Sequence, residues 1–155
     1  MLFLCIISLV QKFSLSHITL FDVSADAVTI FLAFIAVTTN QKTNTSFGFA
    51  AGVLTGLLTG NVGLNMLART VGSFVAGYFN VPKESHATPK QKSRRFYAAV
   101  IVAGLCTNAI LSVGDNPLGF SPGYRIVVFG FLESLFNLIL AIILNWLFLR
   151  QSLAN

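Results

Sequence analysis

Runs of apolar residues, separated by short polar or Pro/Gly-rich stretches, extend along the whole chain. A helix that crosses a membrane needs about 20 predominantly apolar residues, with a range of roughly 17–25. Applied loosely, this criterion predicts an all-α integral membrane protein, a single polytopic domain covering residues 1–155. The predicted spans, about six in number, are 1–13, 26–39, 47–60, 64–79, 97–113 and 124–149. The first run is short, so its start and extent are left open.

Three of the connecting stretches carry turn signals. Asn61-Val62-Gly63 is a tight link between the third and fourth runs. Residues 80–95 hold two prolines with Ser and Lys, which predicts a solvated loop. Residues 115–123 hold two prolines and two glycines, which predicts an ordered turn outside the helices.

A ladder of glycines marks the third run, where Gly48, Gly52, Gly56 and Gly60 stand four residues apart. Each Gly costs about 1 kcal/mol in an ordinary helix interior, so a soluble helix would rarely carry four. In a membrane, small residues at this spacing let another helix approach closely. We therefore expect a helix-packing surface, either against a neighbouring helix of this chain, which we favour, or against a partner. Gly63, Asn65 and Asn137 are further candidates for such contacts.

Composition supports the membrane interpretation. The chain is 55% hydrophobic and only 10% charged, whereas ordinary globular chains carry about 25% charged residues. Five of the ten basic residues fall in one segment, namely Lys83, Lys90, Lys92, Arg94 and Arg95. Between two apolar runs, such a segment indicates a cytoplasmic loop under the positive-inside rule rather than a nucleic-acid site. An even number of spans then predicts both termini on the cytoplasmic side of an inner membrane.

Arg69 and Glu133 are the most costly residues of the predicted spans. An ionisable group in mid-helix costs about 2.5–3.5 kcal/mol on insertion scales and usually faces protein, water or an opposite charge. At about 1.5 Å per residue, their depths differ by an amount that an Arg side chain can largely bridge. We therefore predict that Arg69 pairs with Glu133 inside the bundle. The alternatives are that Arg69 reaches the outer surface and that Glu133 is protonated.

Signals of catalysis are missing from the sequence. There is no GxSxG, HExxH, P-loop or CxxC motif. The predicted membrane separates His17 from His86, so we do not expect them to share a metal. We predict no enzymatic activity, no cofactor and no metal site, and we expect Asn65 and Asn137 to form hydrogen bonds between helices.

The order of these features resembles the bacterial rod shape-determining protein MreD family. The family has a Gln after the first span and then an Asp that leads into an apolar helix, matched here by Gln11 and Asp26. A glycine-rich helix, a short turn and an Asn follow, matched by the glycine ladder, Val62-Gly63 and Asn65. Phe136-Asn137 matches a pair in the last span. In three places the chain departs from the pattern, at Ala25 for the usual proline, Gly56 for a frequent Asp, and Arg69.

This resemblance implies a non-enzymatic inner-membrane component of the cell-elongation complex that regulates cell shape and peptidoglycan synthesis. The fold it implies is similar to the substrate-binding subunits of energy-coupling-factor transporters. The implied partners are the MreC scaffold, the RodA glycosyltransferase, a class B penicillin-binding transpeptidase and the MreB filament, with the lipid bilayer around them. No nucleic acid is implied.

A substrate-binding membrane subunit of a small-molecule, vitamin-type transporter is the alternative, because it would share the size and span count. Such a subunit needs polar residues that converge from different helices on an outer pocket. The candidates for this role are Asp26, Asn65, Arg69, Asp115 and Arg125.

Overall fold

The computed structural model describes residues 2–13, 25–82, 87–114, 119 and 121–146. Within these residues every regular element is helical, which confirms the predicted all-α class. The helices are α1 (Leu2–Phe13), α2 (Ala27–Thr38), α3 (Gln41–Thr59), α4 (Val62–Ala76) with the 3₁₀ turn η2 (Gly77–Phe79), α5 (Pro89–Gly114), α6 (Pro122–Arg125), the π-helical η3 (Ile126–Gly130) and α7 (Phe131–Leu144).

Two helices begin earlier than their apolar runs. Helix α3 starts at Gln41, after Asn40 as its N-cap. Helix α5 starts at Pro89, and the preceding Thr88 exchanges hydrogen bonds with Gln91 in both directions, at 3.0 and 3.4 Å. This reciprocal pair is a capping box, and proline suits the first helical position. Capping therefore extends α5 over Lys90, Lys92, Arg94 and Arg95, which the sequence assigns to a loop.

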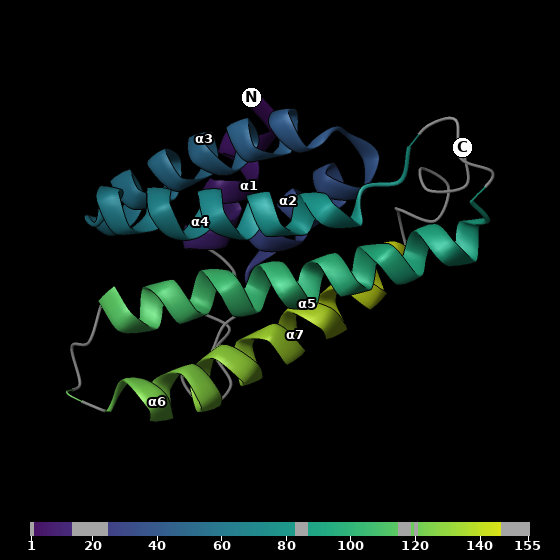
Figure 1. Cartoon of the computed structure of the whole chain (residues 1–155). Coiled ribbons are helices and arrows are strands. Elements are labelled where there is room, and N and C mark those ends of the chain that lie inside the picture. Colours follow the sequence, from purple (N-terminus) through teal and green to yellow (C-terminus); the bar gives the residue numbers. More distant parts are fainter. Residues whose placement is uncertain (1, 14–24, 83–86, 115–118, 120, 147–155) are drawn as a thin grey trace.

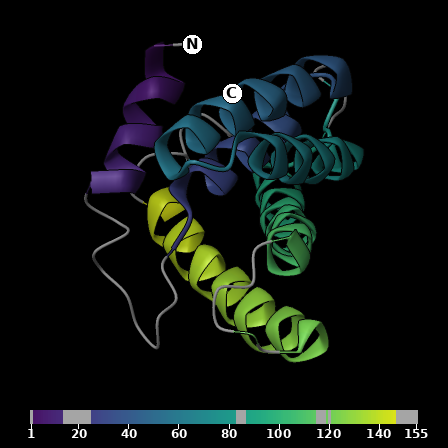
Figure 2. The same ribbon diagram turned by 90° about the vertical axis from the view of Figure 1, so that its left-hand side faces the viewer.

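Helix α2 lies at the centre of the bundle, in contact with α1, α3, α4, α5 and α7. Helices α3 and α4 run side by side, α4 packs on α5, and α5 packs on α7 (Figure 1). Figure 2 shows α1 and α7 at the periphery of the bundle. This arrangement brings the N-terminus of α2 close to side chains from several other helices.

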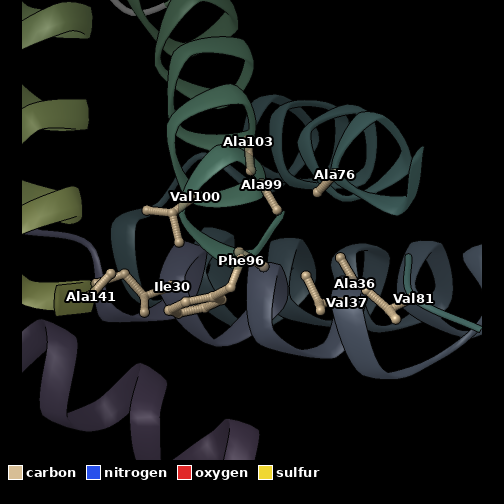
Figure 3. Close-up of a cluster of buried hydrophobic side chains, with 11 residues drawn as sticks. Ile30, Ala36, Val37, Ala76, Val81, Phe96, Ala99, Val100, Ala103 and Ala141 are labelled. Carbon is tan, nitrogen blue, oxygen red and sulfur yellow. The ribbon is translucent and has the colours of Figure 1, made fainter. Parts of the chain in front are cut away.

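The main apolar core forms where α2 crosses α5 (Figure 3). Phe96 of α5 is fully buried there, and its ring meets that of Phe34 edge-on at a centroid distance of 6.4 Å. Much of the remaining cluster consists of small side chains such as Ala33, Ala99 and Ala103. Small residues let the helix backbones approach closely.

One helix of the described residues, α5, is long and apolar enough to cross a membrane by length and composition. Shorter apolar helices are Leu4–Phe13, Ala27–Thr38 and Phe131–Leu144. The described helices overlap the six apolar runs, but only α5 is both long and apolar enough to cross a membrane, so the predicted number of spans is not confirmed.

A candidate buried polar site at the start of helix α2

Asp26 is the N-cap of α2 and the centre of a buried polar site. Its Oδ1 accepts hydrogen bonds from the backbone N–H groups of Val28 and Thr29, at 3.0 and 3.2 Å. Its Oδ2 accepts a third from the Thr29 hydroxyl at 2.7 Å. An N-cap carboxylate satisfies the otherwise unpaired N–H groups of the first turn and favours the helix dipole. The local sequence thus fixes the Asp26 side chain against its own helix.

Arg69 of α4 forms an ion pair with Asp26, with 2.9 Å between its Nη1 and the Asp26 Oδ2. Both side chains are only 7% exposed. The same Nη1 donates to the Thr29 hydroxyl at 3.3 Å, and Nε donates to the Thr55 hydroxyl of α3 at 3.0 Å. One guanidinium therefore joins α2, α3 and α4.

This ion pair corrects the predicted pairing of Arg69 with Glu133. Helix α4 packs on α3, α5 and α2, whereas α7, which carries Glu133, packs mainly on α5. Arg69 therefore points toward α2, where a carboxylate is already oriented by its cap. Comparing depths along two helices could not reveal this, because depth does not say which faces meet.

Gln11 and Asn137 hold the backbone on either side of the ion pair. Gln11 of α1 donates from Nε2 to the Ala25 carbonyl at 2.9 Å and accepts from the Ala27 N–H at 2.8 Å. Asn137 of α7 accepts from the Asp26 N–H at 2.5 Å. Asn137 thus makes the interhelical contact expected of it, and the site includes side chains from α1, α2, α3, α4 and α7.

A cavity of about 230 Å³ adjoins this network. Glu133 lines it together with Arg69, so the two residues of the predicted pair border one space without forming a pair. Within the described residues, the Glu133 side chain forms no ion pair or hydrogen bond. Lys12 and Thr59 at the cavity rim are exposed, which indicates that the cavity opens where α1 and α3 end.

The glycine ladder faces α4 of the same chain. A Cβ added at Gly52 would lie 2.5 Å from the Met66 Cα, and one added at Gly56 would lie 2.5 Å from the Val62 Cα. Gly48 stands equally close to Ser73. Backbone-to-backbone contact of this kind leaves no room for a side chain, so this stripe packs two helices of the bundle.

The other glycine candidates have different positions. Gly60 ends α3 with φ +83°, a left-handed conformation that favours glycine at a helix end. Gly63 is exposed, with nothing within 4 Å of an added Cβ. Neither takes part in the close contact between α3 and α4.

Asn65 links α4 to the end of α3. Its Nδ2 donates to the Thr59 hydroxyl at 3.1 Å and to the Asn61 carbonyl at 2.9 Å. Arg125 lies elsewhere, where it donates to the Ser112 carbonyl at 2.8 Å. The structure thus brings Asp26, Asn65 and Arg69 together at one cavity, but not Arg125. Asp115, His17 and His86 lie outside the described residues.

Sequence reasoning missed the roles of Thr29 and Thr55 in this site. An Asp directly before an apolar run is a recognisable helix-start signal, and it could have located the Asp26 cap. The Thr55 hydroxyl donates a hydrogen bond to the Ala51 carbonyl at 2.8 Å, and its oxygen accepts one from Arg69. Which residue would use that oxygen depends on helix packing, for which the sequence carries no signal.

Chemically, the network of Asp26 is saturated. Both carboxylate oxygens accept two hydrogen bonds each, and the side-chain amide of Gln11 uses both its nitrogen and its oxygen. Such a site joins helices and provides no free acid or base at Asp26. Among the residues that the structure describes, no group of three or more His, Cys, Asp or Glu side chains could hold a metal.

A comparison of the chain with protein-family models, with curated proteins and with solved structures finds no match in any of the three.

Proposed function

We propose that this protein is a non-enzymatic membrane component of the bacterial cell-elongation machinery, similar to MreD. In this proposal it crosses the inner membrane about six times, with both termini in the cytoplasm. It acts by binding MreC and other elongation proteins through its helices and loops.

The convergence of Gln11, Asp26 and Asn137 is the observation that carries the proposal. These residues support the resemblance from separate parts of the sequence, and they meet through direct hydrogen bonds at the start of α2. A resemblance made of unrelated coincidences would scatter such residues over the bundle. Their contact gives the motif one structural role, because its hydrogen bonds join α1 and α7 to the start of α2.

Exposed apolar surface supports the membrane and assembly parts of the proposal. The outward residues of α7 include Phe131, Leu135, Ile139, Ile142 and Ile143, all at least 44% exposed. Large contiguous apolar surfaces indicate contact with a membrane or with a partner protein. In a bilayer this surface of α7 would meet lipid or a partner helix.

Depletion in a rod-shaped host tests the proposal directly. We expect depleted cells to become round and the intact gene to restore rods, because elongation requires the complex. MreC should co-purify with the tagged protein from detergent-solubilised membranes. Unchanged cell shape after complete depletion would rule out this function.

The transporter alternative gains support from one observation, the polar side chains that several helices direct to one cavity. Ligand pockets usually have volumes of about 300–1,000 Å³, and this cavity, at about 230 Å³, is smaller. A vitamin-sized molecule would not fit without movement of the helices. A stoichiometric vitamin-type compound in the purified protein, with normal cell shape after depletion, would favour the transporter instead.

A further inference from the structure

A second cavity, of about 610 Å³, lies where η2 meets the start of α5. Gln91, Arg94 and Arg95 of α5 line it, together with Tyr78 and Phe79 of η2. Pockets that bind small molecules usually measure about 300–1,000 Å³. The cavity is therefore large enough for a ligand, and its lining combines cationic and aromatic side chains.

Positive charge dominates this cavity. Among the described residues that line it, Arg94 and Arg95 are charged and no side chain is acidic. Guanidinium groups in proteins stay protonated at every ordinary pH, so both charges are permanent. Residues 83–95 hold five basic residues and one acid, Glu84, which lies outside the described residues. An anionic ligand therefore matches the charge of the cavity.

Arg94 and Arg95 differ in their contacts with the protein. Arg95 donates from Nη1 to the Asn80 carbonyl at 2.8 Å, which holds its guanidinium beside the end of η2. Arg94 is exposed, and within the described residues its side chain forms no ion pair or hydrogen bond. The planar fork of an arginine matches two oxygens of a phosphate group. Arg94 is thus placed to bind a phosphate, and Arg95 adds a second charge in a fixed position.

Apolar side chains continue from the cavity along the surface of two helices. Tyr78 is 70% exposed, and its ring meets that of the exposed Phe74 of α4 edge-on, at a centroid distance of 5.6 Å. On α5, Ala98 lines the cavity. The exposed Leu105 follows seven residues later, about two turns along the same face of the helix. A small anion alone would leave this surface uncovered, whereas a lipid carries acyl chains that would cover it.

We propose that this cavity binds the headgroup of an anionic phospholipid. Arg94 pairs with the phosphate, and the acyl chains lie along the apolar surface of α4 and α5. In the proposed topology the start of α5 faces the cytoplasm, so the lipid belongs to the cytoplasmic leaflet, where basic pockets between helices bind anionic headgroups. This inference rests on the membrane location in the proposed function but not on the role in cell elongation.

A lipid titration of the purified full-length chain in an uncharged detergent tests the proposal, with thermal unfolding as the readout. Phosphatidylglycerol supplies the anionic lipid. Phosphatidylcholine with the same acyl chains lacks the net charge, and inorganic phosphate lacks the chains. At ten times its Kd, bound phosphatidylglycerol should raise the folded-to-unfolded ratio about 11-fold. We expect phosphatidylcholine and inorganic phosphate at the same concentration to stabilise the protein far less.

Arg94→Gln identifies the site, and Lys92→Gln is its matched control. Both variants remove one positive charge from the same helix, two residues apart, but Lys92 does not line the cavity. Because the Arg94 side chain is exposed, Arg94→Gln should unfold without lipid at the same temperature as the unmodified chain. Its Kd for phosphatidylglycerol should rise about tenfold or more, since a charge-assisted hydrogen bond is lost. Lys92→Gln should change the Kd far less, and Arg94→Lys should retain part of the binding, because it keeps the charge without the fork.

Three results would overturn the proposal. Equal losses in Arg94→Gln and Lys92→Gln would indicate attraction to the whole basic segment instead of a site. Equal stabilisation by phosphatidylcholine would show that the charge is not recognised, and equal stabilisation by inorganic phosphate would show that the chains are not. Binding by the purified chain is measured without reference to cell shape, so a failure here leaves the proposed role in elongation to its own test.

Discussion

At the scale of single residues, Asp26 combines two stabilising roles that usually fall to different side chains. It caps α2 through the N–H groups of Val28 and Thr29, and it neutralises Arg69. The two roles reinforce each other, because the hydrogen bonds of the cap already restrict the carboxylate to the orientation in which it pairs with the guanidinium. A positioned ion pair loses less side-chain entropy than one between two mobile side chains.

Removing the charge of Asp26 should destabilise the protein strongly. In Asp26→Asn the Arg69 guanidinium stays buried without an opposite charge, and breaking a buried pair in this way costs about 3–5 kcal/mol. The free energy of unfolding, measured by denaturant titration in mixed micelles, should fall by that amount. The double variant Asp26→Asn, Arg69→Gln should lose less than the sum of the two single variants, because the pair interacts directly.

Glu133→Gln is the matched control for this prediction. It makes the same change from carboxyl to amide beside the same cavity, but at a residue without an ion pair. We expect it to change the free energy of unfolding far less than Asp26→Asn. Equal losses in the two variants would mean that the bond between Arg69 and Asp26 contributes little to stability.

Sequence alone identified Arg69 as a costly residue that needs a partner, but it did not identify the partner. The free-energy cost can be inferred from the sequence, because the sequence shows a charged residue within an apolar run. The partner depends on the direction in which α4 faces, and that direction results from the packing of the whole bundle. Asp26 lies 43 residues away along the chain, so no local pattern connects the two.

At the scale of elements, close contact between α3 and α4 organises one half of the bundle. The glycine spacing predicted a packing surface, and the structure places Gly48, Gly52 and Gly56 against the backbone or side chains of α4. The sequence could not choose between a helix of this chain and a partner, because both use the same small residues. The short link at Asn61 places α4 next to α3 and favours contact within the chain.

Gly52→Ala should separate these two helices. Alanine alone favours a helix over glycine by about 1 kcal/mol, but its Cβ would lie 2.5 Å from the Met66 Cα, where only backbone can give way. Overpacking of this kind costs typically about 1–3 kcal/mol. We expect a net loss in the free energy of unfolding, measured by denaturant titration of the monomeric protein in detergent.

Gly63→Ala should change the free energy of unfolding in the opposite direction, toward greater stability. Nothing lies within 4 Å of its Cβ, and the position belongs to α4. The propensity gain, up to about 1 kcal/mol, should appear there without a steric cost. If Gly52→Ala instead left the monomer unchanged and altered only its self-association, the ladder would act as an interface between molecules.

At the scale of the whole molecule, the apolar runs predicted where helices lie better than where they begin. Polar first turns extend α3 and α5 beyond their apolar runs, because caps at Asn40 and Thr88 stabilise helix ends that hydropathy does not detect. The central position of α2 in the bundle could not be predicted from the sequence either. Its surroundings are decided by contacts with α1, α3, α4, α5 and α7, which no stretch of sequence specifies.

Sidedness in the membrane is the last prediction, and it tests the proposed topology of the whole chain. If the bundle crosses the inner membrane as proposed, the link between α3 and α4 faces outward and the start of α5 faces the cytoplasm.

Single cysteines are introduced at Gly63 and at Lys90 after Cys5 and Cys106 are replaced by serine. Gly63 suits this purpose because its surroundings are open, and Lys90 is exposed. A membrane-impermeant maleimide should label Gly63→Cys in spheroplasts and Lys90→Cys only after the membrane is permeabilised. Gly123→Cys, also in open surroundings, should behave like Gly63→Cys, because one span of the proposed topology, residues 97–113, separates it from the cytoplasmic loop, just as the span 64–79 separates Gly63 from that loop. Labelling of all three from one side would contradict both the number of spans and the placement of the basic segment, since a chain that crosses between them cannot expose all three to the same solution.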